Sequence, residues 1–472
     1  MSADIKSSWW RPDAAAPRTP WWRPAPATSH ITTGVPTVLP EDSKVPFWAL
    51  FVFTFILMVS PQSYIPVLGP LRIALLSVGV AFMAFVYDRF VTQRPIFVLT
   101  RETRVALLLL GWAVITVPFS YWPGGSVNVI TNYFMKSVVL FVLLSQMINT
   151  VPRLKLIAWG LALMTVPLAL TAVKNYLTGN YMPGDGSTVE RIVGYEAPLT
   201  GNPNDLALTL NLVVPLIIAL LATSRKLSHR VVLGGLIFLN LVAVVATNSR
   251  TGFITLVVIA ALFLVRLCKY RGIGWAVVVL VLLLAAIPFL PGHYIDRITT
   301  IGDMNADTTG SAQERWTYMV AATKYTLTHP FAGAGIGMNM LALNQMTAVP
   351  MWKEVHNVYL EYAAELGIPG LALFLIVLRG ALKSAKTVRD RFENRSDQPE
   401  LFHLADGVRV SLIAFVVAAM FHPVAYHFYF YYFAGLALAA KAIGDAIDTA
   451  TSVPTNTNNV RGKAWTAPSM RV

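Results

Sequence analysis

A single histidine stands where an apolar stretch of the sequence begins, in the segment EVHNVYLEYAAELGIPG at positions 354–370. The positive end of a helix that starts there would disfavour a charged imidazole on His356 and keep the ring neutral near pH 7. A neutral imidazole can accept a proton from a hydroxyl group, and such general-base assistance typically contributes roughly 10²–10⁴-fold in rate. His356 is therefore the candidate catalytic residue. The alternative is a structural histidine that is hydrogen-bonded to a nearby carbonyl.

Four basic residues in segments expected on the outer side of a membrane are candidates for binding an anionic substrate. Arg191 lies in STVERIVGY, Arg250 in ATNSRTGF and Arg315 in AQERWTY, while Lys136 lies inside an expected membrane span. Arginine suits phosphate because its planar fork donates two parallel hydrogen bonds, each worth about 1.5–3 kcal/mol when sheltered. As alternatives, Arg250 and Lys136 could extend to the membrane surface, and Arg191 could be an ordinary surface charge.

Other polar residues near His356 have less definite roles. Glu361 and Glu365 are four residues apart on one expected helix face, where carboxylates must be paired or lie in a wet cavity. Positions 367–370, Gly-Ile-Pro-Gly, predict a break in that helix. The segment HPFAGAGIGM at 329–338 weakly resembles a nucleotide-binding loop, but no βαβ pattern surrounds it, and we expect a flexible turn. No His/Cys/Asp cluster has metal-ligand spacing.

Two further segments predict only ordinary structure. The stretch GNPNDLALTL at 201–210 predicts a capped helix start. His422 and His427 flank a short turn beside the aromatic run FYFYYF at 428–433, which is typical of an interfacial aromatic belt. The only cysteine is Cys268, so no internal disulfide is expected.

The composition defines the elements that must position these residues. Of the 472 residues, 55% are hydrophobic and 13% are charged, about half the charged share of a typical soluble protein, and the mean hydropathy is +0.58. Apolar runs such as VALLLLGWAVITVPF approach, with their flanks, the roughly 20 residues that span a bilayer. We therefore expect an all-α, polytopic integral membrane protein with about 12 transmembrane helices, at 46–66, 70–87, 104–121, 129–148, 154–174, 204–223, 231–247, 251–268, 273–290, 357–382, 408–422 and 426–443.

The distribution of positive charge predicts the orientation of these spans. The net charge is +13, and Lys and Arg collect in alternate connections, for example at 89–104 and 379–395. This pattern is typical of cytoplasmic loops, so we expect both termini in the cytoplasm and see no need for a nucleic-acid partner. Two long connections, at about 175–203 and 291–356, then lie on the opposite face, and the second is expected to form a small subdomain that contains a helix in SAQERWTYMVAATKYTLTHP.

The expected organisation has five parts. They are a disordered cytoplasmic tail (1–45), transmembrane helices 1–9 (46–290), a periplasmic loop subdomain (291–356), transmembrane helices 10–12 (357–445) and a second disordered cytoplasmic tail (446–472). The paired tryptophans of SWWRP and PWWRP in the first tail could rest on membrane lipids, and a Pro-rich disordered segment is the alternative.

The order of these segments resembles the O-antigen ligase/polymerase family of bacterial membrane glycosyltransferases. The matching stretches are GNPNDLA, TNSRTGF, ERWTYMVAATKYTLTHPFAGAGIGM and HNVYLEYAAELGIPGLALFL, between about 200 and 375. The resemblance implies transfer of a glycan from an undecaprenyl-diphosphate-linked donor to an acceptor hydroxyl, on the periplasmic side of the bacterial inner membrane. It implies neither a nucleotide nor a metal cofactor.

The resemblance also implies residue roles. His356 matches the family's candidate base, Arg250 and Arg191 match periplasmic arginines that hold the diphosphate, and Arg315 falls at a further motif position. The acceptor stays open: lipid A–core for a ligase, a growing lipid-linked polysaccharide for a polymerase, or a protein. The non-enzymatic alternative is a transporter or flippase of lipid-linked glycans, although the sequence has no second copy of the broken helix that an inverted repeat would give.

Overall fold

The described part of the chain is helical, as the sequence predicts. The computed structural model describes residues 44–93, 95, 97–182, 191–197, 200–285, 287–289, 291–299, 311–346 and 352–452. Within them no β-strand is found, and a single antiparallel bridge joins Tyr181 to Ile192. The predicted disordered tails lie almost entirely outside the described residues.

Nine helices in the described ranges are long and apolar enough to cross a membrane. This confirms a polytopic all-α protein, and helices also occupy the other predicted span positions, so the number 12 stays a prediction. The nine are α2 (Ile73–Val91), α4 to α5 (Pro123–Met147, with a π-helical turn at Ile130–Phe134), α6 (Val151–Leu177), α7 (Pro203–Thr223), α8 (Leu227–Ala246), α9 (Arg250–Arg271), α14 (Val358–Phe392), α15 (Pro399–Ala418) and α16 (Phe428–Ser452). The shorter helices at the remaining span positions are α1 (Lys44–Val59), α3 (Arg101–Ile115) and α10 (Ile273–Ala285).

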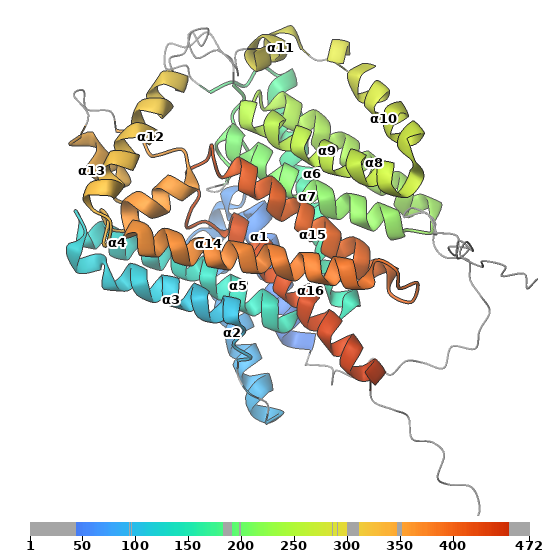
Figure 1. Ribbon diagram of the computed structural model, residues 1–472, viewed down its shortest axis with the longest axis horizontal. Helices are drawn as coiled ribbons and strands as arrows, with labels where there is room; N and C mark the ends of the chain where they lie inside the picture. Colours follow the sequence, from blue (N-terminus) through green and yellow to red (C-terminus); the bar gives the residue numbers. More distant parts are fainter. Residues whose placement is uncertain are drawn as a thin grey trace, which may run out of the picture.

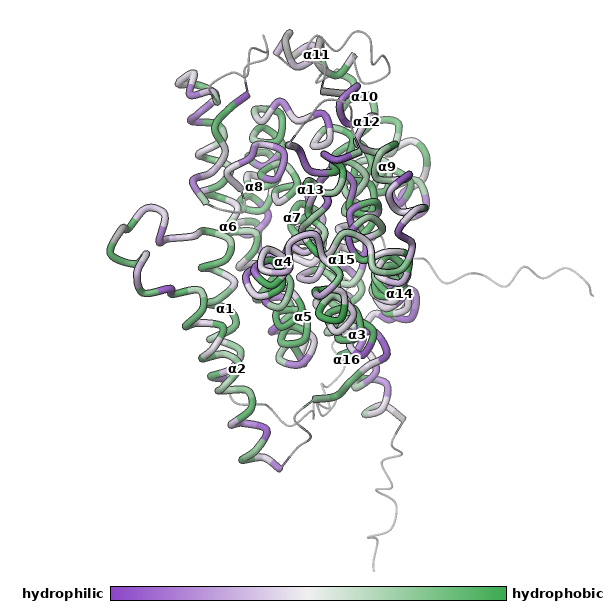
Figure 2. Tube along the Cα trace, turned by 90° about the vertical axis from the view of Figure 1, so that its left-hand side faces the viewer, coloured by the Kyte–Doolittle hydropathy of each residue, from purple (hydrophilic) through white to green (hydrophobic). Residues whose placement is uncertain are grey.

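The long helices form one bundle around a continuous apolar core. Figure 1 shows α3, α5 and α14 running along the long axis, and α14 packs against α3, α15 and α16, while α7 packs against α15 and α8. Figure 2 shows a largely hydrophobic trace along α1 and α5, as expected for helices that face lipid or the core. Three shorter helices, α11 (Gly292–Thr299), α12 (Ser311–Thr328) and α13 (Asn339–Asn344), lie between α10 and α14 in the sequence, and α12 confirms the helix predicted there.

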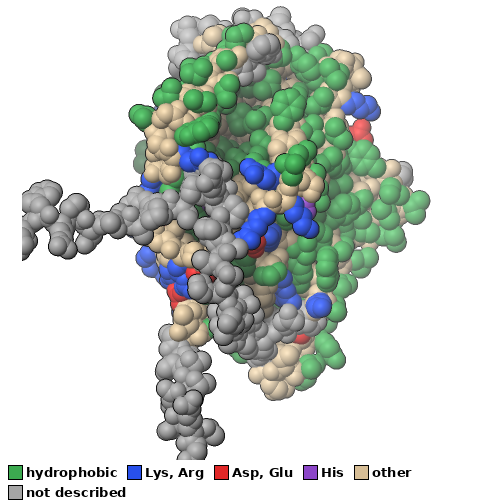
Figure 3. Space-filling model, turned by 90° about the vertical axis from the view of Figure 1, so that its right-hand side faces the viewer, with side chains coloured by type: hydrophobic (Ala, Val, Ile, Leu, Met, Phe, Trp, Pro, Cys, Tyr) green, Lys and Arg blue, Asp and Glu red, His purple; other side chains and the backbone are tan. Residues whose placement is uncertain are grey.

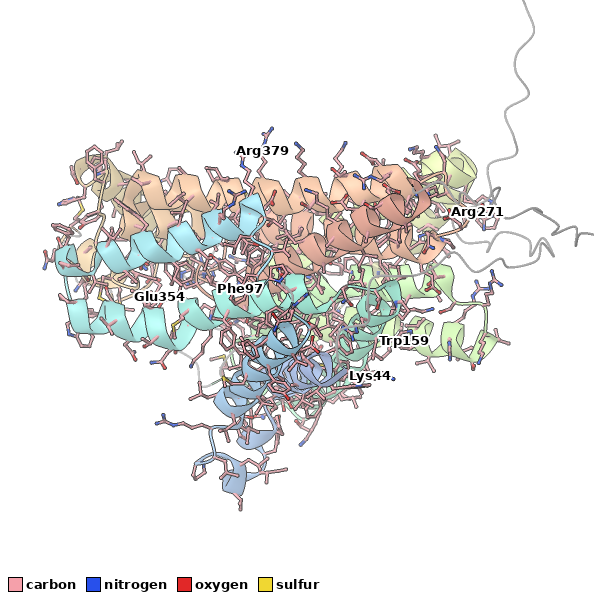
Figure 4. The ribbon with its side chains drawn as sticks, turned by 90° about the horizontal axis from the view of Figure 1, so that it is seen from below. Lys44, Phe97, Trp159, Arg271, Glu354 and Arg379 are labelled. Atoms are coloured by element: carbon pink, nitrogen blue, oxygen red, sulfur yellow. The ribbon has the colours of Figure 1, made fainter. Side chains whose placement is uncertain are left out.

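The two ends of the bundle differ in their polar chemistry. Glu354 and Arg271 lie near opposite ends of the long axis (Figure 4). Figure 3 shows Lys and Arg side chains gathered on the face at the right-hand side of Figure 1. Ion pairs tie together helices from the segments that the charge pattern assigns to the cytoplasm, for example Lys269 with Glu393 at 2.6 Å and Arg395 with Asp448 at 2.7 Å.

Helix α15 begins at Pro399, nine residues before the predicted span at 408–422. The helix thus extends beyond the predicted span, and its first turns contain His403, Asp406 and Arg409, which lower the local hydropathy. Asp406 is nevertheless fully buried, since Arg266, Arg389 and Arg409 all pair with its carboxylate. A buried charge with several ion-pair partners can lie inside a helix bundle, whereas a hydropathy scale scores every charged residue as unfavourable in a span.

Helix α14 is broken at the predicted Gly-Ile-Pro-Gly segment. Gly367 has φ 69° and ψ −175°, and Pro369 has no N–H, so the regular hydrogen-bonding pattern fails at this point. Groups from elsewhere satisfy the freed backbone: Ala334 N donates to Ala364 O (2.8 Å), Gly335 N to Glu365 O (2.9 Å), Trp112 Nε1 to Leu366 O (2.8 Å), and Ile368 N donates to Pro330 O (2.8 Å). The glycine-rich turn is thus docked on α14, which corrects the expectation of a flexible turn.

Candidate active site

A polar cavity of about 340 Å³ lies among the starts of α7 and α16, the segment before α14, and α13. Its size falls in the range of about 300–1,000 Å³ that is usual for ligand pockets. Its polar lining includes two carboxylates and two histidines; the polar side chains are Asn202, Asp205, Lys353, Glu354, His356 and His427. A larger groove of about 570 Å³ between α1 and α2 is lined almost wholly by apolar residues and offers no comparable chemistry.

The histidine selected from the sequence lines this cavity. His356 precedes Asn357, whose side chain caps α14 by accepting hydrogen bonds from the backbone of Tyr359 and Leu360. The ring therefore lies just before the helix, whereas the sequence predicted that the helix starts at His356. Its Nδ1 is 2.9 Å from the carbonyl oxygen of Glu354. Since a carbonyl only accepts, Nδ1 carries the hydrogen, and in the neutral ring Nε2 keeps its lone pair.

The surroundings of His356 favour this neutral ring. Burial and then the positive charge of Arg315 lower the pKa of His356 from 6.5 to about 4, while the bond to the carbonyl of Glu354 opposes this shift. The imidazole is consequently uncharged at every pH well above 4, and it can act as a proton acceptor at neutral pH. The hydrogen bond to a carbonyl that is expected of a structural histidine is present. The same hydrogen bond also fixes the tautomer in which Nε2 can act as a base.

Arg315, on α12, does not line the cavity, but its charge acts on His356. Its neighbour Glu314 pairs with Lys353 at 2.5 Å, which holds α12 against the segment that carries His356. Arg315 is half-buried, and its charge acts on the imidazole of His356. The structure thus brings together two of the five candidate residues, although they are far apart in the sequence.

Sequence reasoning missed a second pair of residues at the cavity. Asp205, in the first turn of α7, lies with its Oδ1 3.3 Å from Nδ1 of His422, which is 2% exposed. Asn202 caps the same helix by accepting from Asn204 N at 2.8 Å, so the predicted capped start is confirmed. The sequence does contain an acidic residue beside the helix cap, Asp205, and a histidine in a short turn, His422. No local pattern, however, indicates that these two residues are in contact.

The aromatic run after His427 belongs to the core. All residues at 428–433 are at most 7% exposed, so the predicted interfacial belt is wrong for this segment. His427 itself lines the cavity, and its ring centroid is 5.1 Å from that of Tyr133. Burial lowers the pKa of His427.

Arg250 and Arg191 lie in segments that are tied to the start of α7. Ser249 donates to Asn204 Oδ1 at 2.8 Å, which places the first residue of α9, Arg250, beside the turn that carries Asp205. The strand-like segment after Arg191 is bonded to the residues before α7, with Gly194 N donating to Gly201 O at 3.1 Å. Both arginines are half-buried, and neither lines the cavity itself.

Lys136 is separate from this group. Its side chain is exposed on α5, and it does not line the cavity. The next residue, Ser137, donates to Tyr426 O at 2.9 Å, so the backbone of α5 supports the turn before α16 at this level. The predicted role of Lys136 in substrate binding gains no support from its position.

The described residues contain no group of three or more His, Cys, Asp or Glu side chains arranged to hold a metal ion.

Residues 235–375 match the family model described as O-antigen ligase. A comparison with curated proteins found no match. The matched segment includes Arg250, Arg315 and His356, whereas Arg191 and Lys136 precede it. This match supports the resemblance that the sequence motifs indicated.

Proposed function

We propose that this chain transfers a glycan from undecaprenyl diphosphate to an acceptor hydroxyl in a ligase-like reaction. The match of residues 235–375 to the O-antigen ligase model supports this proposal. The reaction would take place on the periplasmic side of the inner membrane, in the cavity that His356 lines, with both termini in the cytoplasm. The proposal includes neither a nucleotide nor a metal, because the diphosphate leaves on the lipid carrier and arginine side chains would supply the positive charge.

The observation that supports this proposal most directly is the state of His356. Its Nδ1 is engaged by the carbonyl of Glu354, and its pKa is lowered to about 4, which leaves Nε2 as a proton acceptor. A chemical step that needs a neutral base beside a cation suits this arrangement. Arg315 supplies the cation, since its charge acts on the same ring.

The proposed step forms one bond and breaks another. The acceptor oxygen attacks the anomeric carbon of the donor sugar while the bond from that carbon to the diphosphate oxygen breaks. The bonding electron pair leaves with the diphosphate, the acceptor proton passes to His356, and the configuration at the anomeric carbon inverts. Arg315, Arg250 and Arg191 would stabilise the growing negative charge on the diphosphate, which is where such preorganised groups contribute most.

The test uses the purified full chain in detergent with a labelled undecaprenyl-diphosphate glycan. His356→Ala should lower transfer by roughly 10²–10⁴-fold, the usual contribution of a general base. His329→Ala is the matched control, because His329 is exposed just after α12, stacks on Tyr325 and does not line the cavity. Normal transfer by the His356 variant, at normal membrane insertion, would remove this residue from the reaction.

The same assay separates the alternative functions. Detergent removes the membrane barrier, so a transporter of lipid-linked glycans forms no product, whereas an enzyme does. Lipid A–core, a second lipid-linked glycan and a protein are offered in turn as acceptors. A product on lipid A–core supports the ligase-like activity, and elongation of the lipid-linked glycan alone would identify a polymerase.

A further inference from the structure

Glu365 on α14 collects hydrogen bonds from the segment that opens α13. Its carboxylate is fully buried and accepts from Gly337 N at 2.6 Å, from Asn339 N at 3.1 Å and from Asn339 Nδ2 at 2.5 Å. Three donors from one short segment match the several acceptor sites of a carboxylate. The glycine-rich turn and α13 are thereby fixed to α14 just before its break at Gly367.

Asn339 continues this chain of contacts towards the cavity. Its side chain is 3% exposed, and its Oδ1 accepts from the backbone nitrogen of Val355 at 3.0 Å. The two ends of the amide cannot be exchanged, because its nitrogen faces a carboxylate that accepts and its oxygen faces an N–H that donates. Glu365 therefore sets the orientation of Asn339, and Asn339 holds the residue that directly precedes His356.

The backbone on the other side of His356 is held as well. Val358 N donates to Ala419 O at 2.8 Å, and Asn357 N donates to Val355 O at 2.8 Å. His356 thus lies between two anchored residues, and only the anchor at Val355 depends on side chains. A residue held by buried, satisfied contacts keeps its position, and a shift of about 1 Å in a reacting group can cost roughly 10²-fold in rate.

Glu361, one turn earlier on α14, has a parallel contact with the opposite wall. Its Oε2 accepts from Ala425 N at 3.2 Å, in the turn between His422 and His427. Tyr362 adds a bond from its hydroxyl to Ala425 O at 2.7 Å. The two buried carboxylates of α14 therefore hold two different segments of the cavity wall.

We infer that Glu365 and Asn339 are positioning residues for His356, acting through the backbone of Val355. This inference rests on the proposed function, because it assigns the pair a role in placing the base. Neither side chain lines the cavity, so both act without touching the substrate.

The experiment exchanges the donor and acceptor within the pair. Asn339→Asp places two carboxylates against each other, and Glu365→Gln turns an amide N–H towards a donor on the segment at 337–339. Each single variant should lower kcat at least tenfold, with little change in KM for the donor lipid. In the double variant the amide introduced at position 365 can donate to the carboxylate introduced at position 339, and that carboxylate still accepts from Val355 N, but the backbone N–H of residue 339 loses the Glu365 oxygen that it shares with its own side chain in the parent chain. Transfer should therefore rise at least several-fold above both single variants without reaching that of the parent chain.

Control variants and thermal unfolding complete the test. Gln345→Glu adds the same charge at the exposed end of α13 and should leave kcat unchanged. Full activity in both single variants would overturn the inference. So would inactive single variants that the double variant does not rescue and whose unfolding temperatures fall together, since that pattern indicates general destabilisation. The parent chain, assayed in parallel, tests the proposed function itself, which fails if that chain forms no product. His356→Asn tests the role of His356, and full transfer by that variant would remove this residue from the reaction.

Discussion

The Nδ1 atom of His422 lies 3.3 Å from Oδ1 of Asp205, and this contact joins the turn before α16 to the first turn of α7. The same aspartate also acts on His356: Arg315 and His422 lower the pKa of His356, whereas Asp205 raises it. Arg315 and Asp205 therefore affect the same imidazole with opposite sign, although only Asp205 lines the cavity.

Replacing Arg315 should change the pH dependence of transfer. The charge of Arg315 is the second cause, after burial, of the lowered pKa of His356, so Arg315→Gln should raise this pKa from about 4 towards 6.5. A general base becomes protonated and inactive when the pH falls below its pKa. The acidic limb of the pH profile of kcat/KM therefore reports the pKa of this base in the free enzyme. The limb should therefore move to higher pH in the variant. The measurement is a pH profile of initial rates with a saturating acceptor.

Lys324→Gln is the matched control for this change. Lys324 lies on the same helix, α12, and is exposed, so its removal should leave the acidic limb in place. A limb at the same pH in the parent chain and in Arg315→Gln would contradict the electrostatic link between Arg315 and His356.

Replacing Arg250 or Arg191 should weaken binding of the donor. One sheltered charge-assisted hydrogen bond is worth about 1.5–3 kcal/mol, so Arg250→Gln and Arg191→Gln should each raise the Kd for the lipid diphosphate by roughly 10- to 100-fold. Binding of a fluorescent undecaprenyl-diphosphate glycan to the purified chain measures this directly. Arg379→Gln removes an exposed arginine from α14 and serves as the charge-matched control. Unchanged affinity in both site variants would assign these arginines to the membrane surface.

Adding one methyl group at the break of α14 should destabilise the site. A Cβ on Gly367 would lie 2.1 Å from Phe331 O, and the residue has φ 69°, a conformation that L side chains rarely adopt. Gly367→Ala should cost at least about 1–3 kcal/mol, the order of a strained backbone residue, and should lower transfer because the turn at 330–335 is displaced. Thermal unfolding in detergent and the transfer assay measure the two effects.

Gly111→Ala on α3 provides the comparison, since a Cβ there meets nothing within 4 Å. This change should leave stability unchanged or raise it by about 0.5–1 kcal/mol, as expected in a helix interior. Equal unfolding temperatures for Gly367→Ala and the parent chain would show that the break tolerates a side chain.

Local patterns predicted the helices well, because each span depends on its own apolar composition. They did not anticipate the first turns of α15, where Asp406 is buried against Arg266 and Arg389, since hydropathy contains no information about partners from α9 and α14. They also failed for the aromatic run at 428–433, because a single sequence does not show whether an apolar helix faces lipid or its neighbours.

The candidate site was predicted only in part. His356 and Arg315 could be selected by residue type and context, and the structure brings them together. The contact between Asp205 and His422 spans 217 positions, so no local pattern could reveal it. The role of Lys136 in substrate binding stays a prediction, since its side chain is exposed on α5 and does not line the cavity.

The break in α14 has a consequence for how the chain enters the membrane. The carbonyls of Ala364, Glu365 and Leu366 are satisfied by Ala334, Gly335 and Trp112, not by their own helix. Unsatisfied backbone groups are costly in lipid, so this span is incomplete as an isolated helix when it leaves the ribosome. We therefore expect its stable insertion to depend on the turn at 330–335 and on α3, which both precede it in the sequence, so that this end of the bundle is completed in the order of synthesis.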